Sequence, residues 1–273
     1  MSTLLIGHNS DQLDLSNTNI NMDGAKIISS IISNKNCPLT YIKIGNNCMQ
    51  DINVGIMIFK SISFNKSIKD IDFTTNNFRF STSELEELIK VLAESIKNHP
   101  CIRKLDISGN RIKDSLYCLA DNCPPSLKYL TIGFNSFITD KELSYIIKNT
   151  ELHTINILGI SPMFLLNYCK SSIEYNRSLI NILYSWNYQH SSKDDIINVD
   201  RVIEPVLLRN RLMRDKAKKA ALQLLLIKKY STNNNLLLLL PRDIIIIIAK
   251  RVFNSYFCDE WYQVKKIKKH KNK

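Results

Sequence analysis

The sequence predicts an α/β fold in which strand–helix repeats stack into one curved parallel sheet, followed by a small α-helical C-terminal module. Three observations support this fold class. A frame of aliphatic residues that ends in asparagine recurs along the chain, segments of helical period lie between its copies, and positive charge is concentrated after residue 200. The first two observations predict the repeats, and the third predicts the separate C-terminal module.

The recurring frame reads aliphatic-x-x-aliphatic-x-aliphatic-x-x-Asn, with Phe in one aliphatic place, and four copies are complete. Side chains alternate along a strand, so one strand of this kind has an apolar side that only stacked copies can bury. The asparagine comes where the chain turns out of the strand, and its amide can bond backbone groups that lack ladder partners. We therefore expect a structural role for the four asparagines, which are Asn47, Asn76, Asn110 and Asn135.

The spacing of the frame indicates its repeat length and its ends. Successive asparagines are 29, 34 and 25 residues apart, which is typical of strand–helix repeats with one insertion. Thr18 replaces asparagine in a copy before the first, and Ile160 replaces it in a copy after the fourth. Terminal repeats are expected to be irregular because they cap the stack, so about six repeats are predicted over residues 1–160.

The segments between the strands have the apolar period of amphipathic helices, most clearly at 23–32, 83–93 and 140–147. For the helix at 83–93, Ser81, Thr82 or Ser83 can cap the start. Glu86 lies three residues after Ser83, as in a capping box. The other two helices begin with an acidic residue, which favours the positive end of a helix.

This frame resembles the leucine-rich repeat family, and specifically its ribonuclease-inhibitor-like subclass, in which each strand is paired with a full α-helix. The resemblance covers about residues 10–160. It implies a curved solenoid that binds other proteins along the concave face lined by its strands. The implied partner-binding residues on that face are Tyr41, Lys43, Asp70, Asp72, Lys104, Asp106, Tyr129, Thr131 and Phe134.

The residue types on this expected face favour a protein partner. Tyrosine and exposed phenylalanine are enriched at the energetic centres of protein interfaces. Charges of both signs lie side by side, which suits a partner of mixed charge better than nucleic acid. The sequence therefore predicts a surface for another protein, whose identity it does not give.

The sequence contains no recognisable catalytic, metal-binding or cofactor-binding motif. The five histidines are scattered, and no HExxH, CxxC, Walker loop or GxGxxG occurs. We therefore expect no enzymatic activity, no metal and no cofactor. The seven cysteines are odd in number and no secretory signal or membrane segment is evident, which predicts an intracellular, cytoplasmic protein without membrane contact.

The positive charge lies in the last quarter of the chain. Residues 201–273 contain eighteen Lys or Arg against five Asp or Glu, whereas residues 1–200 contain nineteen against twenty. This contrast predicts a helical cap and linker over 161–200, a basic helical module over 201–264 and a basic tail over 265–273. Within the module, Arg209–Tyr230 and Arg242–Phe257 have the composition of helices.

The start of the second of these helices resembles the opening of F-box and F-box-like modules, which begin with a Leu-Pro-x-acidic-Ile element. Similar segments end repeat proteins of large DNA viruses, including the poxviral ankyrin-repeat class. The resemblance implies binding of a Skp1-type adaptor, although Asp243 stands where many such modules have Glu, and F-boxes usually precede their repeats. The implied adaptor-binding residues are Leu240, Pro241, Asp243, Ile244, Ile245 and Ile248.

Three hypotheses about function follow. The first is a non-enzymatic scaffold that binds a protein on its concave face. The second is an F-box-like substrate receptor of a ubiquitin ligase; in the competing interpretation, the same C-terminal segment only caps the solenoid. The third is association with nucleic acid, or nuclear targeting, through the basic tail at 265–273.

Overall fold

The computed structural model describes residues 11–34, 36–47, 51–76, 81–112, 115–135, 138–160, 165–184 and 193–230. The chain divides into two compact units, Met1–Val206 and Leu207–Lys273, and each is considered by itself. The predicted adaptor-binding residues Leu240, Pro241, Asp243, Ile244, Ile245 and Ile248 lie outside the described residues. The predicted basic tail at 265–273 also lies outside them, so both remain predictions.

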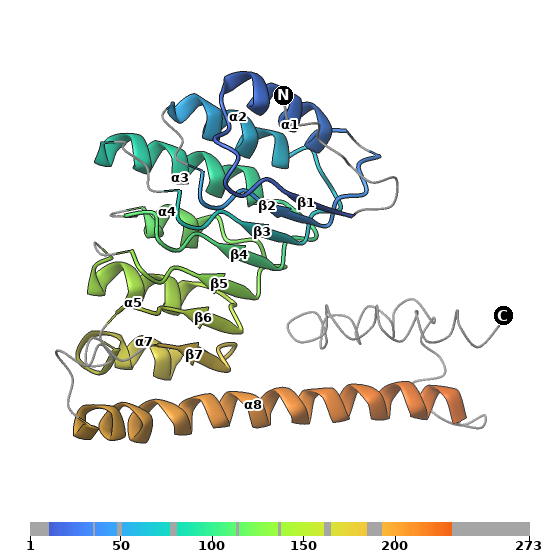
Figure 1. Cartoon of the computed structure of the whole chain (residues 1–273). Helices are drawn as coiled ribbons and strands as arrows, with labels where there is room; N and C mark the ends of the chain where they lie inside the picture. The colour runs from blue at the N-terminus through green and yellow to red at the C-terminus, as the bar shows by residue number, and fades with distance from the viewer. Residues whose placement is uncertain are drawn as a thin grey trace. The chain divides into compact units, whose positions relative to one another are not determined.

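The described residues of the first unit form a sheet of seven parallel strands in chain order, in which consecutive strands are paired (Figure 1). This arrangement confirms the predicted fold class of strand–helix repeats around a parallel sheet. The strands are β1 (Gln12–Asp14), β2 (Tyr41–Lys43), β3 (Asp70–Asp72), β4 (Lys104–Asp106), β5 (Tyr129–Thr131), β6 (Thr154–Asn156) and β7 (Asn181–Leu183).

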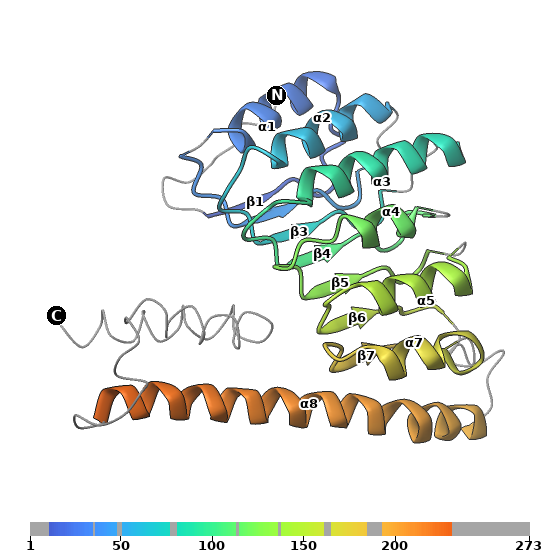
Figure 2. The same cartoon turned by 180° about the vertical axis from the view of Figure 1, so that it is seen from behind.

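Helices follow the strands and form a second layer on one side of the sheet (Figure 2). Successive helices pack against each other along the stack, so each repeat is buried by its neighbours. The helices of this layer are α1 (Met22–Ile32), α2 (Ile52–Ile62), α3 (Thr82–Ile96), α4 (Leu116–Asp121), α5 (Asp140–Asn149), the π-helix η1 (Leu165–Cys169) and α7 (Lys170–Tyr175).

The aliphatic positions of the frame form the core between the two layers. Each strand buries its central residue, and in the five repeats of β2 to β6 the frame positions before and after that residue are buried as well. Phe73 takes the third aliphatic place in its repeat, and its ring packs on Phe59 of α2 with 4.6 Å between ring centroids. Both rings are fully buried, so the larger side chain of Phe73 is accommodated by a residue of the helix layer.

The predicted helices at 23–32, 83–93 and 140–147 are present as α1, α3 and α5. The start of α3 differs from the predicted capping box of Ser83 and Glu86. Ser81 caps this helix, and Glu84 accepts from its backbone N–H at 2.7 Å. The box begins two residues earlier because the helix starts at Thr82, and the three candidate hydroxyls were equivalent by sequence alone.

The sheet extends past the six predicted repeats. Leu179 and Ile182 occupy the first two frame positions of a seventh copy, but Tyr184 stands in the third. The Tyr184 hydroxyl donates to Asp200 Oδ1 in α8 (Lys193–Tyr230), where Val199 and Ile203 are buried. Helix α8 also starts well before the predicted helix at Arg209. The seventh strand is therefore held by a helix that the frame did not predict.

Candidate functional site

The exposed side of the sheet consists of the two residues that flank the buried centre of each strand. Strand side chains alternate, so these flanking residues point away from the helix layer and remain at least partly exposed. We call this surface the strand face. Its members are Gln12, Asp14, Tyr41, Lys43, Asp70, Asp72, Lys104, Asp106, Tyr129, Thr131, Thr154, Asn156, Asn181 and Leu183.

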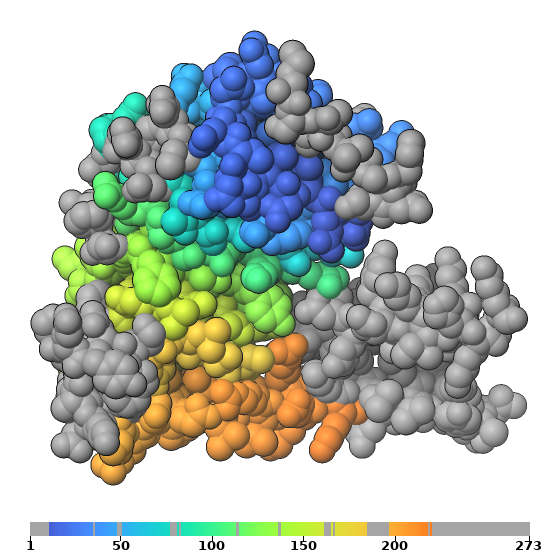
Figure 3. Space-filling model, in the orientation of Figure 1, coloured from blue at the N-terminus to red at the C-terminus, as the bar shows by residue number. Residues whose placement is uncertain are grey.

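Strand register arranges the strand face in two columns. Tyr41, Asp70, Lys104 and Tyr129 are neighbours in the first column, while Lys43, Asp72, Asp106 and Thr131 are neighbours in the second. Eight of the nine predicted partner-binding residues thus lie together, although they come from four segments of the chain. Phe134 lies three residues beyond the end of β5. In the space-filling view the repeats follow each other in bands from blue to yellow (Figure 3).

The strand face has a charged part and an uncharged part. On β1 to β4, six of the eight flanking residues are charged, four of them aspartates and two lysines. On β5 to β7, none of the six flanking residues is charged, and Tyr129 and Leu183 are 38% and 43% exposed. The charged part carries two more negative than positive charges, while the chain as a whole carries +12.

The aspartates at the ends of the strands also close the turns that follow. Asp72 Oδ1 accepts from the backbone N–H of Thr74 at 3.1 Å and from its hydroxyl at 2.8 Å. Asp106 Oδ1 accepts from the backbone N–H and hydroxyl of Ser108 at 3.1 and 2.7 Å. The sequence analysis missed this role. The signal was the recurrence of Asp-x-Ser or Asp-x-Thr with the aspartate as the last residue of a strand, which is typical of such turns.

Asn156 occupies the same position on β6, and its Oδ1 accepts from the backbone N–H of Leu158 at 3.1 Å. An uncharged side-chain oxygen at this place can therefore accept the backbone hydrogen bond of the turn as a carboxylate does. This equivalence separates the structural role of Asp72 and Asp106 from their electrostatic role.

The negative charges of the strand face are only partly paired. Lys43 Nζ lies 3.4 Å from Asp14 Oδ2, an exposed ion pair that contributes at most about 1 kcal/mol. Asp72 and Asp106 are neighbours across β3 and β4 and have no ion pair with any described residue. Burial raises the pKa of Tyr41, and the charges of Asp72, Asp14 and Asp70 raise it further, which shows the negative potential here.

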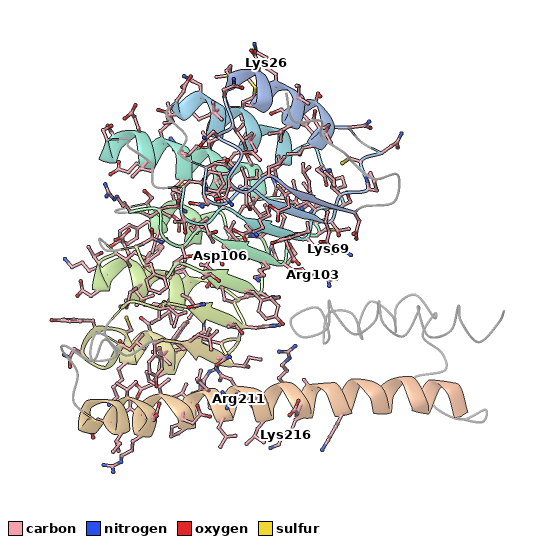
Figure 4. The ribbon with its side chains drawn as sticks, in the orientation of Figure 1. Lys26, Lys69, Arg103, Asp106, Arg211 and Lys216 are labelled. Atoms are coloured by element: carbon pink, nitrogen blue, oxygen red, sulfur yellow. The ribbon has the colours of Figure 1, made fainter. Side chains whose placement is uncertain are left out.

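Two basic residues border this surface at the edge where the strands begin. Lys69 and Arg103 precede β3 and β4, and the backbone N–H of Arg103 donates to the carbonyl of Lys69 at 2.6 Å. Figure 4 labels both side chains at that edge, whereas Lys26 lies on the helix layer in α1. Positive charge therefore borders the strand face at the start of β3 and β4, while the strand ends carry the aspartates.

Phe134 is exposed and has an unusual backbone conformation. Its side chain is 63% exposed and its φ is +54°, in the left-handed region that an aromatic residue rarely adopts. The equivalent residues of other repeats are Asn17, Asn46, Thr75, Gly109 and Gly159, all with positive φ. The turn needs a left-handed residue just before the asparagine position, but it does not need an aromatic ring.

The four frame asparagines are buried and joined in a ladder of hydrogen bonds. The backbone N–H of Asn47 donates to Asn76 Oδ1 at 3.0 Å, that of Asn76 to Asn110 Oδ1 at 2.8 Å, and that of Asn110 to Asn135 Oδ1 at 2.9 Å. Thr18 begins the ladder by donating its N–H to Asn47 Oδ1 at 2.9 Å. The ladder joins consecutive repeats behind the strand ends, so these residues support the strand face without being part of it.

A second set of polar side chains closes the turns between helices and strands, and the sequence analysis missed it. Asn65 Oδ1 accepts from the backbone N–H groups of Ser67 and Ile68 at 2.7 and 2.8 Å. His99 Nδ1 does the same for Cys101 and Ile102 at 3.3 and 3.2 Å. In a third repeat, Asn176 Oδ1 accepts from the backbone N–H groups of Ser178 and Leu179. Each of these residues stands three before the first aliphatic residue of its frame, which was the available signal.

The described residues contain no group of three or more His, Cys, Asp or Glu that could hold a metal ion. Burial raises the pKa of Cys123 and of Cys169 to about 12, so these thiols are not activated as nucleophiles. Within the part of the chain that the structure covers, no helix has the length and apolar character needed to cross a membrane.

Comparisons with known proteins agree with this architecture. The family model described as Leucine Rich repeat matches residues 98–115. No curated protein matches the chain. Solved structures similar to this chain include a tropomodulin C-terminal domain of Caenorhabditis elegans, with 21% identity and a TM-score of 0.43 over 60% of this chain and 98% of that one.

Two further solved structures are similar to this chain. Leiomodin-1 Actin-Binding Site 2 has 12% identity and a TM-score of 0.44 over 75% of this chain and 96% of that one. The leucine-rich repeat-containing protein LegL7 of Legionella pneumophila has 15% identity and a TM-score of 0.52 over 73% of this chain and 64% of that one. Together, the sheet topology, the family match and the likeness to LegL7 show that this chain has a leucine-rich repeat fold.

Proposed function

We propose that this protein is a non-enzymatic scaffold that binds another protein on the strand face, and that its repeats belong to the ribonuclease-inhibitor-like subclass, which makes this face concave. The observation that carries the proposal is the alternation of burial along seven consecutive parallel strands. It leaves a continuous row of exposed side chains along the sheet, which includes eight of the nine residues that the sequence predicts to bind a partner.

The dimensions of the strand face suit a protein ligand. Seven strands at a spacing of about 4.8 Å extend over about 29 Å, which matches an extended segment of about nine residues. The backbone beneath these side chains is rigid, because hydrogen bonds pair the strands and the frame asparagines link the turns of consecutive repeats. A rigid surface loses little conformational entropy on binding, which favours affinity.

Site-specific photo-crosslinking tests this proposal. A benzophenone amino acid replaces Tyr129 on the strand face in one protein and Phe64, two residues after the end of α2, in another. Both are aromatic residues, and Phe64 is the more exposed, at 62% against 38%. We expect a crosslinked protein partner in cell extract from position 129 and not from position 64.

Equal crosslinking from the two positions, or crosslinking from position 64 alone, would contradict the proposal, because Phe64 is the more accessible. Purified protein with either label is first compared by circular dichroism, so that loss of fold is not mistaken for loss of binding.

A further inference from the structure

We propose that the strand face binds a partner segment with an arginine or lysine two to four residues from an apolar side chain. The cation lies between Asp72 and Asp106, and the apolar group lies against Tyr129 and Phe134. This inference rests on the proposed function above and adds the chemistry of the ligand.

The cation position follows from two carboxylates that the fold places side by side. Asp72 and Asp106 are paired by register on adjacent strands, about 4.8 Å apart. Like charges at this distance disfavour the folded sheet unless a cation joins them. Lys43, the lysine next to Asp72 in the same column, instead approaches Asp14.

The stereochemistry of the two aspartates suits an incoming cation. In each of them the turn hydrogen bonds go to Oδ1. The carboxylates are thereby held in place at the strand ends before a ligand arrives. A guanidinium group presents N–H donors on several edges and can bridge two carboxylates, and a lysine ammonium can donate to both as well.

The apolar position follows from the uncharged part of the strand face. Tyr129 lies on β5, one strand beyond Asp106, and Phe134 follows that strand. The Phe134 ring is exposed although other repeats place asparagine, threonine or glycine there with the same sign of φ. One edge of the ring lies against Gly159 of the next repeat, but the side chain as a whole remains 63% exposed in a strained conformation, so we assign its exposed part to ligand binding.

The spacing between the two positions is set by the sheet. The midpoint of β3 and β4 lies about 7 Å from β5, which requires about two residues of extended chain. Tyr129 and Phe134 lie to either side of the aspartate column along the chain of β5, and reaching either of them requires up to about two residues more. A segment that crosses the strands therefore places its cation and its apolar side chain two to four residues apart.

Selection from a displayed random library of peptides of about twelve residues, long enough to cross the sheet, tests the inference. The bait is the full chain. We expect enriched peptides to combine Arg or Lys with an aromatic or aliphatic residue at this spacing. A representative synthetic peptide is then measured by fluorescence anisotropy against the wild type and its variants.

The charge variant is Asp72→Asn/Asp106→Asn, which retains both turn acceptors, as Asn156 shows. We expect the peptide to bind it at least about tenfold more weakly, because charge-assisted hydrogen bonds are lost. The remaining binding should depend little on salt, whereas wild-type binding should weaken between about 0.05 and 0.5 M NaCl. The control Glu86→Gln/Glu87→Gln changes the net charge equally at exposed positions of α3 and should bind like the wild type.

The apolar variant is Phe134→Asn, because Asn46 has the same left-handed conformation at the equivalent position. It should weaken peptide binding about tenfold or more, and the control Phe64→Asn should not.

The outcomes separate this inference from the proposed function. Peptides without basic residues that still lose binding in Phe134→Asn would overturn the inference and leave strand-face binding intact. Peptides that bind equally to every variant would overturn the inference, and the crosslinking experiment would then decide the proposed function. Acidic peptides, or no enrichment at all, would overturn the inference, and the crosslinking experiment would then decide the proposed function independently.

Discussion

Replacement of His99 by asparagine should remove one source of acid sensitivity from the repeats. His99 is 3% exposed, and its Nδ1 accepts from the backbone N–H groups of Cys101 and Ile102. Burial, followed by the charge of Lys66, lowers its pKa to about 4, against the opposing effect of the Asn65 carbonyl. A protonated ring has no acceptor at Nδ1, so protonation breaks both hydrogen bonds.

The direction and size of the effect follow from the two pKa values. The unfolded chain binds a proton at His99 near pH 6.5, and the folded chain does so only near pH 4. The stabilisation is therefore complete above about pH 6.5 and is lost as the pH falls from there to about 4. We expect the loss to be about 2–3 kcal/mol for the wild type. Asparagine does not titrate, and it closes the same turn in two other repeats, where Asn65 and Asn176 occupy the equivalent position.

Urea denaturation followed by circular dichroism, at several values between about pH 7.5 and pH 4, measures this effect. Other groups titrate equally in both proteins, so the difference in unfolding free energy between wild type and His99→Asn isolates the histidine. Between about pH 7.5 and pH 4, the wild type should lose about 2–3 kcal/mol more unfolding free energy than His99→Asn. His99→Ala should be less stable than both at neutral pH, by about 2–4 kcal/mol relative to the wild type, because two buried N–H groups lose their acceptor. If the wild type and His99→Asn lose stability in parallel over this range, the assigned role of Nδ1 is wrong.

Three further predictions concern the repeats. Asn110→Ala should lower the unfolding free energy by about 2–4 kcal/mol in urea denaturation, because a buried acceptor and a buried donor are lost together; a change below about 0.5 kcal/mol would show that the ladder is dispensable. Gly133→Ala should lower the unfolding free energy by about 2 kcal/mol or more, because its new Cβ would lie 2.6 Å from a backbone oxygen. Gly24→Ala, in the first turn of α1, should be neutral or stabilising by up to about 1 kcal/mol. Equal changes in the melting temperatures of the two variants would contradict this prediction. Phe134→Asn should raise the unfolding free energy by about 1 kcal/mol as left-handed strain is relieved, and a fall in stability would mean that the ring supports the fold.

Much of the fold could be predicted because each repeat carries its own signal. The aliphatic frame places Ile71, Leu105 and Leu130 at buried strand centres, and these residues are 1%, 0% and 2% exposed. A few side chains are enough to predict a strand of three residues, and each further repeat with the same spacing strengthens the prediction. The seventh strand was missed because Tyr184 interrupts its frame, and its neighbouring helix begins only at Lys193.

The candidate site was predicted less completely, because one residue type can have two roles. Asp72 and Asp106 were interpreted as surface charges, but they also accept the hydrogen bonds of the turns. His99 was one of five scattered histidines, although its place in the frame is that of Asn65 and Asn176. Asn65, His99 and Asn176 occupy the same place in the repeat, and each accepts hydrogen bonds from the backbone of the following turn. Because they are not all the same type of residue, a search for recurring residue types does not find them.

The sequence by itself determined the repeat, its buried positions and its asparagines, because alternation and spacing are properties of a single segment of chain. The tertiary structure decided which residues meet across repeats. Asp72 and Asp106 are 34 residues apart, and they become neighbours only because the loops absorb the unequal repeat lengths and keep the strands in register. The left-handed backbone at Phe134 and the shared acceptors of the ladders likewise depend on how one turn packs against the next. Contacts of this kind depend on distances between segments, which the local pattern does not contain.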